Sequence, residues 1–221
     1  MNNNNYIETE QKLAISYDNI GNTFYYQGNG QEAINNFNQA LNLSQYLPEN
    51  ELGMLNFNLG RALLNIGELL SAITYFEQAI KLIPDLIQAE YHKNTILKGY
   101  NFGRDWFSRN IQIWSKYLTK FIDKPELNVL EIGSWEGRST CWLLDNILTH
   151  PTTKITCIDT FAGSFEHQDS GENYLQSIEK KFDFNISITG KNNQVNKIVG
   201  EYWEKLRSLP LNNYDFIYID G

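Results

Sequence analysis

The sequence predicts an α + α/β protein, in which helical hairpins at the N-terminus precede a parallel α/β sheet. The first observation behind this prediction is a pattern of glycine, alanine and aromatic residues that recurs within residues 13–99. The second is that short apolar runs alternate with helical patterns over residues 103–221. Strands that alternate with helices form a parallel sheet with right-handed crossovers. We therefore expect two domains, preceded by a flexible polar head at residues 1–12.

The recurring pattern in the first domain becomes visible when Gly21 is aligned with Gly60, 39 residues further along the chain. The same offset relates Ile20 to Leu59, Phe24 to Leu63, Gly28 to Gly67, Ala33 to Ala72, Phe37 to Phe76, and Ala40 to Ala79. A glycine in the middle of a helix lets a neighbouring helix approach closely, and an aromatic residue fills the space between the two. A glycine at the end of a helix adopts a positive φ at little cost.

This pattern resembles the tetratricopeptide repeat, a helical hairpin of about 34 residues. Pro84 closes the second copy where that family places its proline. The first copy is longer by about five residues around 45–50, so either its second helix or the following turn is extended. Two repeats and a further helix at 85–100 form a short array, and such arrays usually need about three repeats. We therefore expect that helix to pack on the domain that follows.

The resemblance implies a possible groove for a protein or peptide partner on the inner helices. Polar and aromatic side chains on these helices would line such a groove, namely Asn22, Tyr26, Asn58, Arg61 and Asn65. Asparagine is abundant throughout the chain, so the pattern is equally compatible with a purely structural extension.

In the second domain the sequence predicts eight elements in alternation. The expected helices span 103–122, 139–148, 172–182 and 201–208, and the expected strands span 128–132, 154–159, 197–199 and 214–219. Ligands of such sheets bind outside the carboxyl ends of the strands. The segment "GSWEG" at 133–137, which we call the glycine turn, follows the first strand directly.

Acidic residues accompany the glycine turn at these strand ends. Glu131 lies just before it, Asp159 ends the second strand and Asp220 follows the fourth. A dinucleotide site requires the spacing GxGxxG for close approach to a pyrophosphate, whereas this turn is GxxxG with a bulky Trp-Glu pair inside it. Carboxylates and a glycine turn suit a ligand with hydroxyl groups and a positive centre, and S-adenosylmethionine has both.

Three segments in order, "VLEIGSWEGRST", "ITCIDTF" and "YDFIYIDG", resemble the cofactor half of a class I S-adenosylmethionine-dependent methyltransferase. The likeness covers residues 103–221 and implies a Rossmann-like sheet. The cofactor-binding residues it implies are Glu131, Gly133, Ser134, Trp135, Gly137, Asp159, Thr160 and Phe161. It further implies that Asp159 accepts hydrogen bonds from the ribose hydroxyls and that Asp220 faces the methyl-transfer region as a catalytic residue. In related metal-dependent O-methyltransferases an aspartate at this strand end binds a divalent cation, but no second ligand is visible in this sequence, so no metal ligand is assigned.

Each of these residues also has a structural explanation. Glu131 would otherwise cap the next helix, Asp159 would be a turn residue and Trp135 a packing aromatic. His167 in the polar loop would be either a general base or an exposed loop residue. Because the chain stops after the fourth strand, we expect a partial methyltransferase domain that is inactive alone.

Composition excludes several other classes of protein. A net charge of −8 and a pI near 4.9 argue against a nucleic-acid or membrane partner, which would need a basic surface. The polar head lacks the features of a secretory signal, and two isolated cysteines indicate reduced thiols, so we expect a cytoplasmic location. The remaining alternatives are a protein-interaction scaffold with a non-catalytic sheet domain and, less favoured, a nucleotide-dependent Rossmann enzyme.

Overall fold

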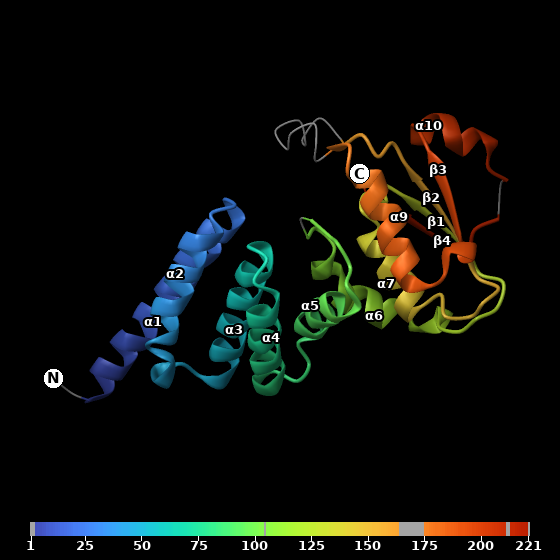
Figure 1. The fold of residues 1–221 in the computed structure, drawn as a ribbon. Helices are drawn as coiled ribbons and strands as arrows, with labels where there is room; N and C mark the ends of the chain where they lie inside the picture. The colour runs from blue at the N-terminus through green and yellow to red at the C-terminus, as the bar shows by residue number, and fades with distance from the viewer. Residues whose placement is uncertain (1–2, 104, 164–174, 211–212, 221) are drawn as a thin grey trace. The chain divides into compact units, whose positions relative to one another are not determined.

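The structure is a computed structural model that describes residues 3–103, 105–163, 175–210 and 213–220. The chain divides into two compact units, Met1–Lys98 and Gly99–Gly221. Figure 1 shows the order of the elements in both units, and each unit is described by itself.

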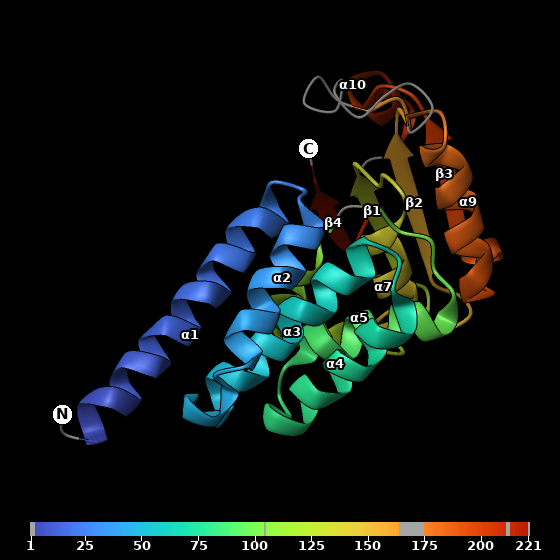
Figure 2. The same ribbon diagram turned by 60° about the vertical axis from the view of Figure 1, so that its left-hand side comes forward.

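The first unit consists of two helical hairpins and a further helix, as predicted (Figures 1 and 2). Its helices are α1 (Asn3–Tyr26), α2 (Gly30–Leu41), α3 (Glu49–Asn65), α4 (Leu69–Leu82) and α5 (Ile87–Lys98). Gly28 and Gly67 follow the first helix of each hairpin with φ values of +80° and +86°. This left-handed conformation favours glycine, which explains the repeated glycine at both turns.

The polar segment expected as a flexible head at residues 1–12 is instead helical from Asn3 onward. Its polar side chains form bonds one helical turn apart: Thr9 Oγ1 donates to the Asn5 carbonyl at 2.7 Å, and Lys12 pairs with Glu8 at 2.5 Å. Helix extension adds one backbone hydrogen bond per residue, so a polar segment continues a helix that is already formed.

The additional residues of the first repeat lie in the turn after α2. That turn contains the short 3-10 helix η1 (Ser44–Tyr46), whereas α2 has 12 residues and α4 has 14. The extension therefore lengthens the connection and leaves the helix pattern of the repeat intact.

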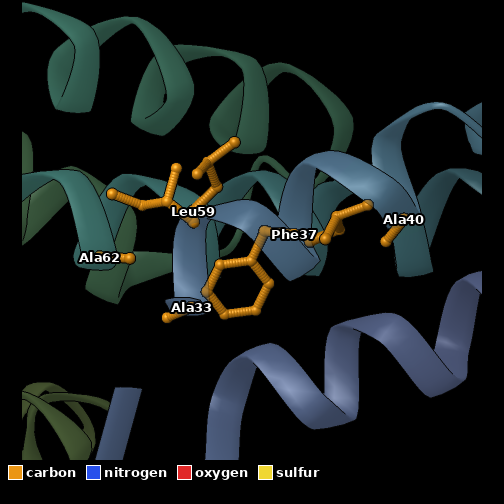
Figure 3. Close-up of a cluster of buried hydrophobic side chains, with 7 residues drawn as sticks. Ala33, Phe37, Ala40, Leu59 and Ala62 are labelled. Carbon is orange, nitrogen blue, oxygen red and sulfur yellow. The ribbon is translucent and has the colours of Figure 1, made fainter. Parts of the chain in front are cut away.

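The core of the first hairpin is built around Phe37, which is fully buried (Figure 3). The cluster of buried side chains around it comprises Ala33, Ile34, Ala40, Leu55, Leu59 and Ala62. A Cβ atom added at Gly21 would lie 2.5 Å from Phe37 Cε1, and one added at Gly60 would lie 2.7 Å from Phe76 Cε1. The glycine and the aromatic ring of each repeat are therefore one packing unit.

We expect Gly21→Ala to destabilise the repeat unit by about 1–3 kcal/mol, the cost of overpacking a filled core. Helix propensity alone favours alanine by about 1 kcal/mol. A decrease in the free energy of unfolding would therefore show the effect of the contact with Phe37. Urea unfolding followed by circular dichroism measures the effect. Combining the change with Phe37→Leu should be less damaging than the sum of the single changes; additivity would contradict the proposed contact.

The second unit contains an all-parallel sheet of four strands in the order β3-β2-β1-β4. The strands are β1 (Asn128–Ile132), β2 (Lys154–Asp159), β3 (Val195–Val199) and β4 (Phe216–Ile219). The first two match their predicted bounds, while β3 begins two residues earlier and β4 two residues later than predicted. Ile132 is paired with both Ile158 and Ile219, so the strands end together at one edge, which we call the carboxyl edge.

Among the described residues that follow β1, the helices are α7 (Arg138–Asn146), α9 (Ile178–Thr189) and α10 (Tyr202–Lys205), with the 3-10 helices η5 (Asn192–Gln194) and η6 (Leu206–Ser208). The helix predicted over 172–182 is found later, as α9, and residues 172–174 lie outside the described part of the chain.

The helix predicted over 103–122 is wrong in extent. In the described part of this range, only α6 (Ile111–Tyr117) is α-helical, between the 3-10 helices η2 (Ser108–Asn110) and η3 (Thr119–Phe121). Asp105 Oδ1 accepts the backbone N–H groups of Phe107 at 3.0 Å and Ser108 at 2.8 Å. A carboxylate that accepts the N–H groups two and three residues later has the geometry of a helix N-cap, so helical structure begins after Asp105 and not at residue 103.

Helices cover both faces of the sheet. Glu131 faces α7, which lies beside α9 (Figure 1). Leu130, Ile132 and Ile158 point to the opposite face and pack against a group that includes Leu206 and Leu209. Among the helices that the structure describes, none combines the length and the apolar character that crossing a bilayer requires.

Candidate functional site

The hydrogen-bond ladder of the sheet continues for one residue past the strand ends. The Gly133 N–H donates to the Ile158 carbonyl at 2.9 Å, and the Asp220 N–H donates to the Ile132 carbonyl at 2.8 Å. Gly200, after β3, donates to the Asp159 carbonyl at 2.9 Å. The structure therefore brings the glycine turn, the end of β2 and Asp220 to the carboxyl edge.

Asp159 connects two loops at this edge. Its Oδ2 accepts the backbone N–H of Trp135 at 2.8 Å, and its Oδ1 accepts the N–H of Phe161 at 2.6 Å. Trp135 has a φ of 49° and Phe161 a φ of 53°, in the left-handed region that bulky residues seldom occupy. Such strain persists only where the surroundings hold it, and it gathers at functional sites. The carboxylate of Asp159 holds both strained residues.

The two glycines of the turn are required by contacts within the chain. Gly133 has a φ of +84°, and a Cβ atom added to it would lie 1.7 Å from the carbonyl oxygen of Asp220. Gly137 has a φ of +81°, precedes α7, and would place a Cβ atom 3.0 Å from the ring of Phe182. A side chain at position 133 would therefore push β4 away from the turn.

Glu131 points under α7 and away from the exposed part of the carboxyl edge. It is completely buried and accepts hydrogen bonds from Ser139 Oγ at 2.5 Å and from Thr140 Oγ1. The Cys157 thiol lies 3.5 Å from its Oε2. Burial raises the pKa of the Glu131 carboxyl, and the hydroxyl donors oppose that rise. The contacts of Glu131 thus join β1 to the first turn of α7.

The raised pKa of Glu131 makes a testable contribution to stability. The folded state retains the proton to a higher pH than the unfolded state, so stability falls as pH rises from the unfolded pKa to the folded pKa. In the E131Q chain this contribution is absent. We expect E131Q to gain stability relative to the unmodified chain across that window, by about 1.4 kcal/mol for each unit of the pKa difference.

Urea unfolding at a series of pH values measures this difference. Tryptophan fluorescence is the suitable signal because all five tryptophans lie in the second unit. A stability difference between the two chains that stays constant with pH would contradict the assignment.

The other predicted residues take varied positions. Ser134 is buried, and its carbonyl accepts the Gly137 N–H at 2.8 Å. Thr160 Oγ1 accepts the N–H of Ala162 at 3.3 Å in a local turn. Phe161 is buried and packs on Phe182, with ring centroids 5.2 Å apart.

Asp220 is exposed at the carboxyl edge, where it influences a residue that the sequence prediction missed. The pKa of Tyr218 is raised well above its usual range by burial and by the negative charge of Asp220. Two positions considered from the sequence, Gly221 and His167, lie outside the described residues.

Two further polar residues were missed from the sequence. Glu136 is buried and pairs with Lys181, whose Nζ lies 2.7 Å from Glu136 Oε1. Asn185 of α9 is fully buried and donates to the Glu136 carbonyl at 2.9 Å. Glu136 sits inside the glycine turn and could have been flagged there, but no sequence pattern connects Asn185 to a turn 49 residues away.

Comparison with known proteins identifies both halves of the chain. Residues 130–221 match the family model described as a methyltransferase domain, and residues 12–85 match the model described as a tetratricopeptide repeat. The chain carries a methyltransferase domain after a tetratricopeptide-repeat region. This confirms the family resemblance and the fold class predicted from the sequence.

Two individual proteins show partial likeness. Photosystem I assembly protein Ycf3 from Acaryochloris marina (strain MBIC 11017) is 31% identical over 93 residues, which is 41% of this chain and 55% of the relative. A solved structure of an O-GlcNAc transferase mutant from Thermobaculum terrenum shares 14% identity with a TM-score of 0.41, covering 92% of this chain and 38% of the other. The chain therefore spans about half the length of the curated relative and less of the solved structure.

In the repeat region, the residues considered for a partner groove lie on α1 and α3. Asn22 donates to the Asp18 carbonyl at 3.1 Å, and Asn58 Nδ2 donates to Asp18 Oδ1 at 3.0 Å. Burial raises the pKa of the Asp18 carboxyl. The guanidinium carbon of Arg61 lies 4.4 Å from the centre of the Tyr25 ring and 5.8 Å from that of Tyr26. Asn22 and Asn58 thus share Asp18 as a partner, and Arg61 lies against two tyrosines of α1. Asn58 is buried, whereas Asn65 is exposed near Arg61 in sequence.

In the methyltransferase domain, no three or more His, Cys, Asp or Glu side chains among the described residues are grouped as a metal site. Both cysteines, Cys141 and Cys157, are buried and are not joined in a disulfide.

Proposed function

We propose that the methyltransferase domain binds S-adenosylmethionine at the carboxyl edge and transfers its methyl group to an acceptor. The observation that carries this proposal is the position of Asp159, whose carboxylate lies beside the glycine turn at the carboxyl edge and is partly exposed. The family match to residues 130–221 supports the same reaction class.

The acceptor capacity of Asp159 fits the proposed cofactor. An ionised carboxylate has about four lone-pair sites, and the N–H groups of Trp135 and Phe161 use two of them. The remaining sites suit two hydroxyl donors on adjacent carbons, such as those of a ribose. A charged acceptor makes hydrogen bonds about twice as strong as a neutral one. We therefore propose Asp159 as the ribose-binding residue.

The glycine turn supports a ligand without phosphate. The bulky Trp135 and the buried Glu136 occupy its centre, and Lys181 is paired with Glu136. The backbone N–H of Trp135 is already bonded to Asp159, and that of Gly137 to the Ser134 carbonyl. Because these amides are engaged, they are not directed at an anion. An ammonium or sulfonium group suits this surface better.

Asp220 is our proposed catalytic residue. When bound, the cofactor supplies an activated methyl group, so the protein has to align the acceptor and remove its proton. Asp220 is exposed at the carboxyl edge, and a carboxylate there is a suitable proton acceptor for a hydroxyl or an amine. The other proposed cofactor contacts are Gly133, Ser134, Gly137, Thr160 and Phe161.

We further propose that the repeat region binds a protein or peptide partner through the surface on α1 and α3. A relative that matches 93 residues of this chain is named as a photosystem I assembly protein. Its name supports a role in protein binding. This likeness also favours a second candidate function, in which the repeats are a scaffold and the methyltransferase domain is not catalytic.

Isothermal titration of the full chain with S-adenosylmethionine, and in parallel with NAD, tests the proposal. Saturable binding of S-adenosylmethionine without binding of NAD supports the methyltransferase. Binding of NAD alone would favour a nucleotide-dependent enzyme. Absence of binding by either compound would favour the scaffold.

A further inference from the structure

The segment directly before the methyltransferase match contacts the glycine turn closely. We call residues 99–103 and 105–107 the N-terminal arm. It lies between α5 and α6, contains no regular secondary structure, and precedes the family match that begins at residue 130. Several side chains from within the matched region nevertheless bond to the backbone of the arm.

Asn185 makes the first connection between the arm and the glycine turn. Its Oδ1 accepts the Asn101 N–H at 2.7 Å, and its Nδ2 donates to the Asn101 carbonyl at 3.1 Å. The same Nδ2 donates to the Glu136 carbonyl at 2.9 Å. Asn185 is completely buried, so loss of these bonds would leave buried polar groups without partners. One amide thus joins α9, the arm and the turn.

Glu136 and Arg138 make the second connection, at Gly103. The Gly103 N–H donates to Glu136 Oε2, and the Gly103 carbonyl accepts from Arg138 at 3.0 Å. Lys181 neutralises the other oxygen of Glu136 at 2.7 Å. Because Glu136 is only 1% exposed, its charge depends on these partners. Glu136, in the centre of the glycine turn, therefore binds the backbone of the arm.

Aromatic contacts complete the connection next to Asp159. Trp106 of the arm packs edge-on against Trp135, with ring centroids 5.7 Å apart and an interplanar angle of 75°. Trp135 is the strained residue whose N–H meets Asp159. The arm thus supports the residue that links the turn to the proposed ribose acceptor.

We propose that the N-terminal arm is a part of the cofactor site, and that Asn185 and Glu136 are positioning residues that fix the glycine turn through it. This inference rests on the proposed function for its ligand and on the contacts above for its mechanism. Ordering the turn before the ligand arrives lowers the cost of binding, which is the benefit of preorganisation.

Hydrogen exchange of the full chain without ligand tests the mechanism. The amides of Gly133, Trp135 and Gly137 are all hydrogen bonded, so a peptide covering 133–137 reports the order of the turn. We expect Asn185→Ala to accelerate exchange there by at least about tenfold, the equivalent of 1.4 kcal/mol. Glu136→Ala should have a similar effect, and Glu136→Gln should restore protection, because it keeps the acceptor for Gly103.

Gln194→Ala is the matched control. Gln194 is also a buried amide, and its Nε2 donates to the His150 carbonyl at 3.0 Å and to Thr153 Oγ1 at 2.5 Å, neither of which belongs to the arm or to the glycine turn. Gln194→Ala should lower the free energy of unfolding of the chain. Under conditions in which the chain stays folded, it should not accelerate exchange at 133–137. Unchanged exchange in both Asn185→Ala and Glu136→Ala would overturn the proposal.

The dissociation constant of S-adenosylmethionine tests the link to the site. We expect it to rise by at least about tenfold in Asn185→Ala and by less than about threefold in Gln194→Ala. Faster exchange with unchanged affinity would overturn the assignment of the arm to the site. If the unmodified chain binds no S-adenosylmethionine, the proposed function fails, and the exchange experiment still decides whether the arm orders the turn.

Discussion

Replacing Asp159 with alanine is expected to weaken S-adenosylmethionine binding by at least about 100-fold. The carboxylate is proposed to accept two hydroxyl bonds, and each bond to a charged group contributes about 1.5–3 kcal/mol. The change also removes the acceptors for the Trp135 and Phe161 amides, so the loops at the carboxyl edge lose their common anchor. Isothermal titration of the full chain measures the loss.

Asp159→Asn separates the two effects. Asparagine has the same shape and keeps one acceptor for a backbone amide, but it lacks the charge that strengthens bonds to hydroxyls. We expect an affinity between those of the unmodified chain and the alanine variant. An affinity within about threefold of the unmodified chain in Asp159→Ala would show that the ligand is bound elsewhere.

Gly133→Ala should be the most destabilising single change in the methyltransferase domain, at more than about 4 kcal/mol. Its Cβ would overlap the Asp220 carbonyl at 1.7 Å, and the backbone directly after β4 cannot move aside as a flexible side chain can. The positive φ of +84° adds about 1–2 kcal/mol for any residue with a Cβ. Urea unfolding followed by tryptophan fluorescence measures the total.

Gly190→Ala isolates the backbone component in the same domain. Gly190 ends α9 with a φ of +69°, and nothing lies within 4 Å of the position of its Cβ. We expect a loss of only about 1–2 kcal/mol. Equal losses at positions 133 and 190 would show that the close approach to Asp220 contributes nothing.

Strands β1 and β2 were predictable to the residue because each is a short apolar run bounded by turn residues. Burial on both faces gives such strands a continuous apolar sequence. The start of helical structure near α6 was not apparent from the apolar spacing, because it depends on one local side chain, the Asp105 carboxylate, which accepts the next backbone N–H groups. The polar residues before Ala14 likewise gave no apolar pattern that would predict a helix. This part of α1 is stabilised by the helical residues that follow it.

The carboxyl edge was predictable as a meeting place because parallel strands all end on the same side. The direction in which each acidic side chain points was harder to predict from the sequence. The side chain of Glu131 lies on the face of the sheet that α7 covers. There its carboxylate accepts hydrogen bonds from Ser139 and Thr140, two hydroxyl residues of that helix. Asp159 ends its strand and turns toward Trp135. Local sequence contains the partners of Glu131, but the contribution of Asn185 arises only from tertiary packing.

The N-terminal arm begins almost directly after the last helix of the repeat region. Lys98 ends α5, and Tyr100 already donates its hydroxyl to Asp145 of α7 at 2.8 Å. Gly99 is the single residue between them, and one residue spans at most about 3.6 Å. If the repeats bind a partner as proposed, the covalent linker to the sheet domain therefore adds almost no length of its own. Glycine–serine insertions at this point would lengthen the linker while leaving the sequence of both halves unchanged.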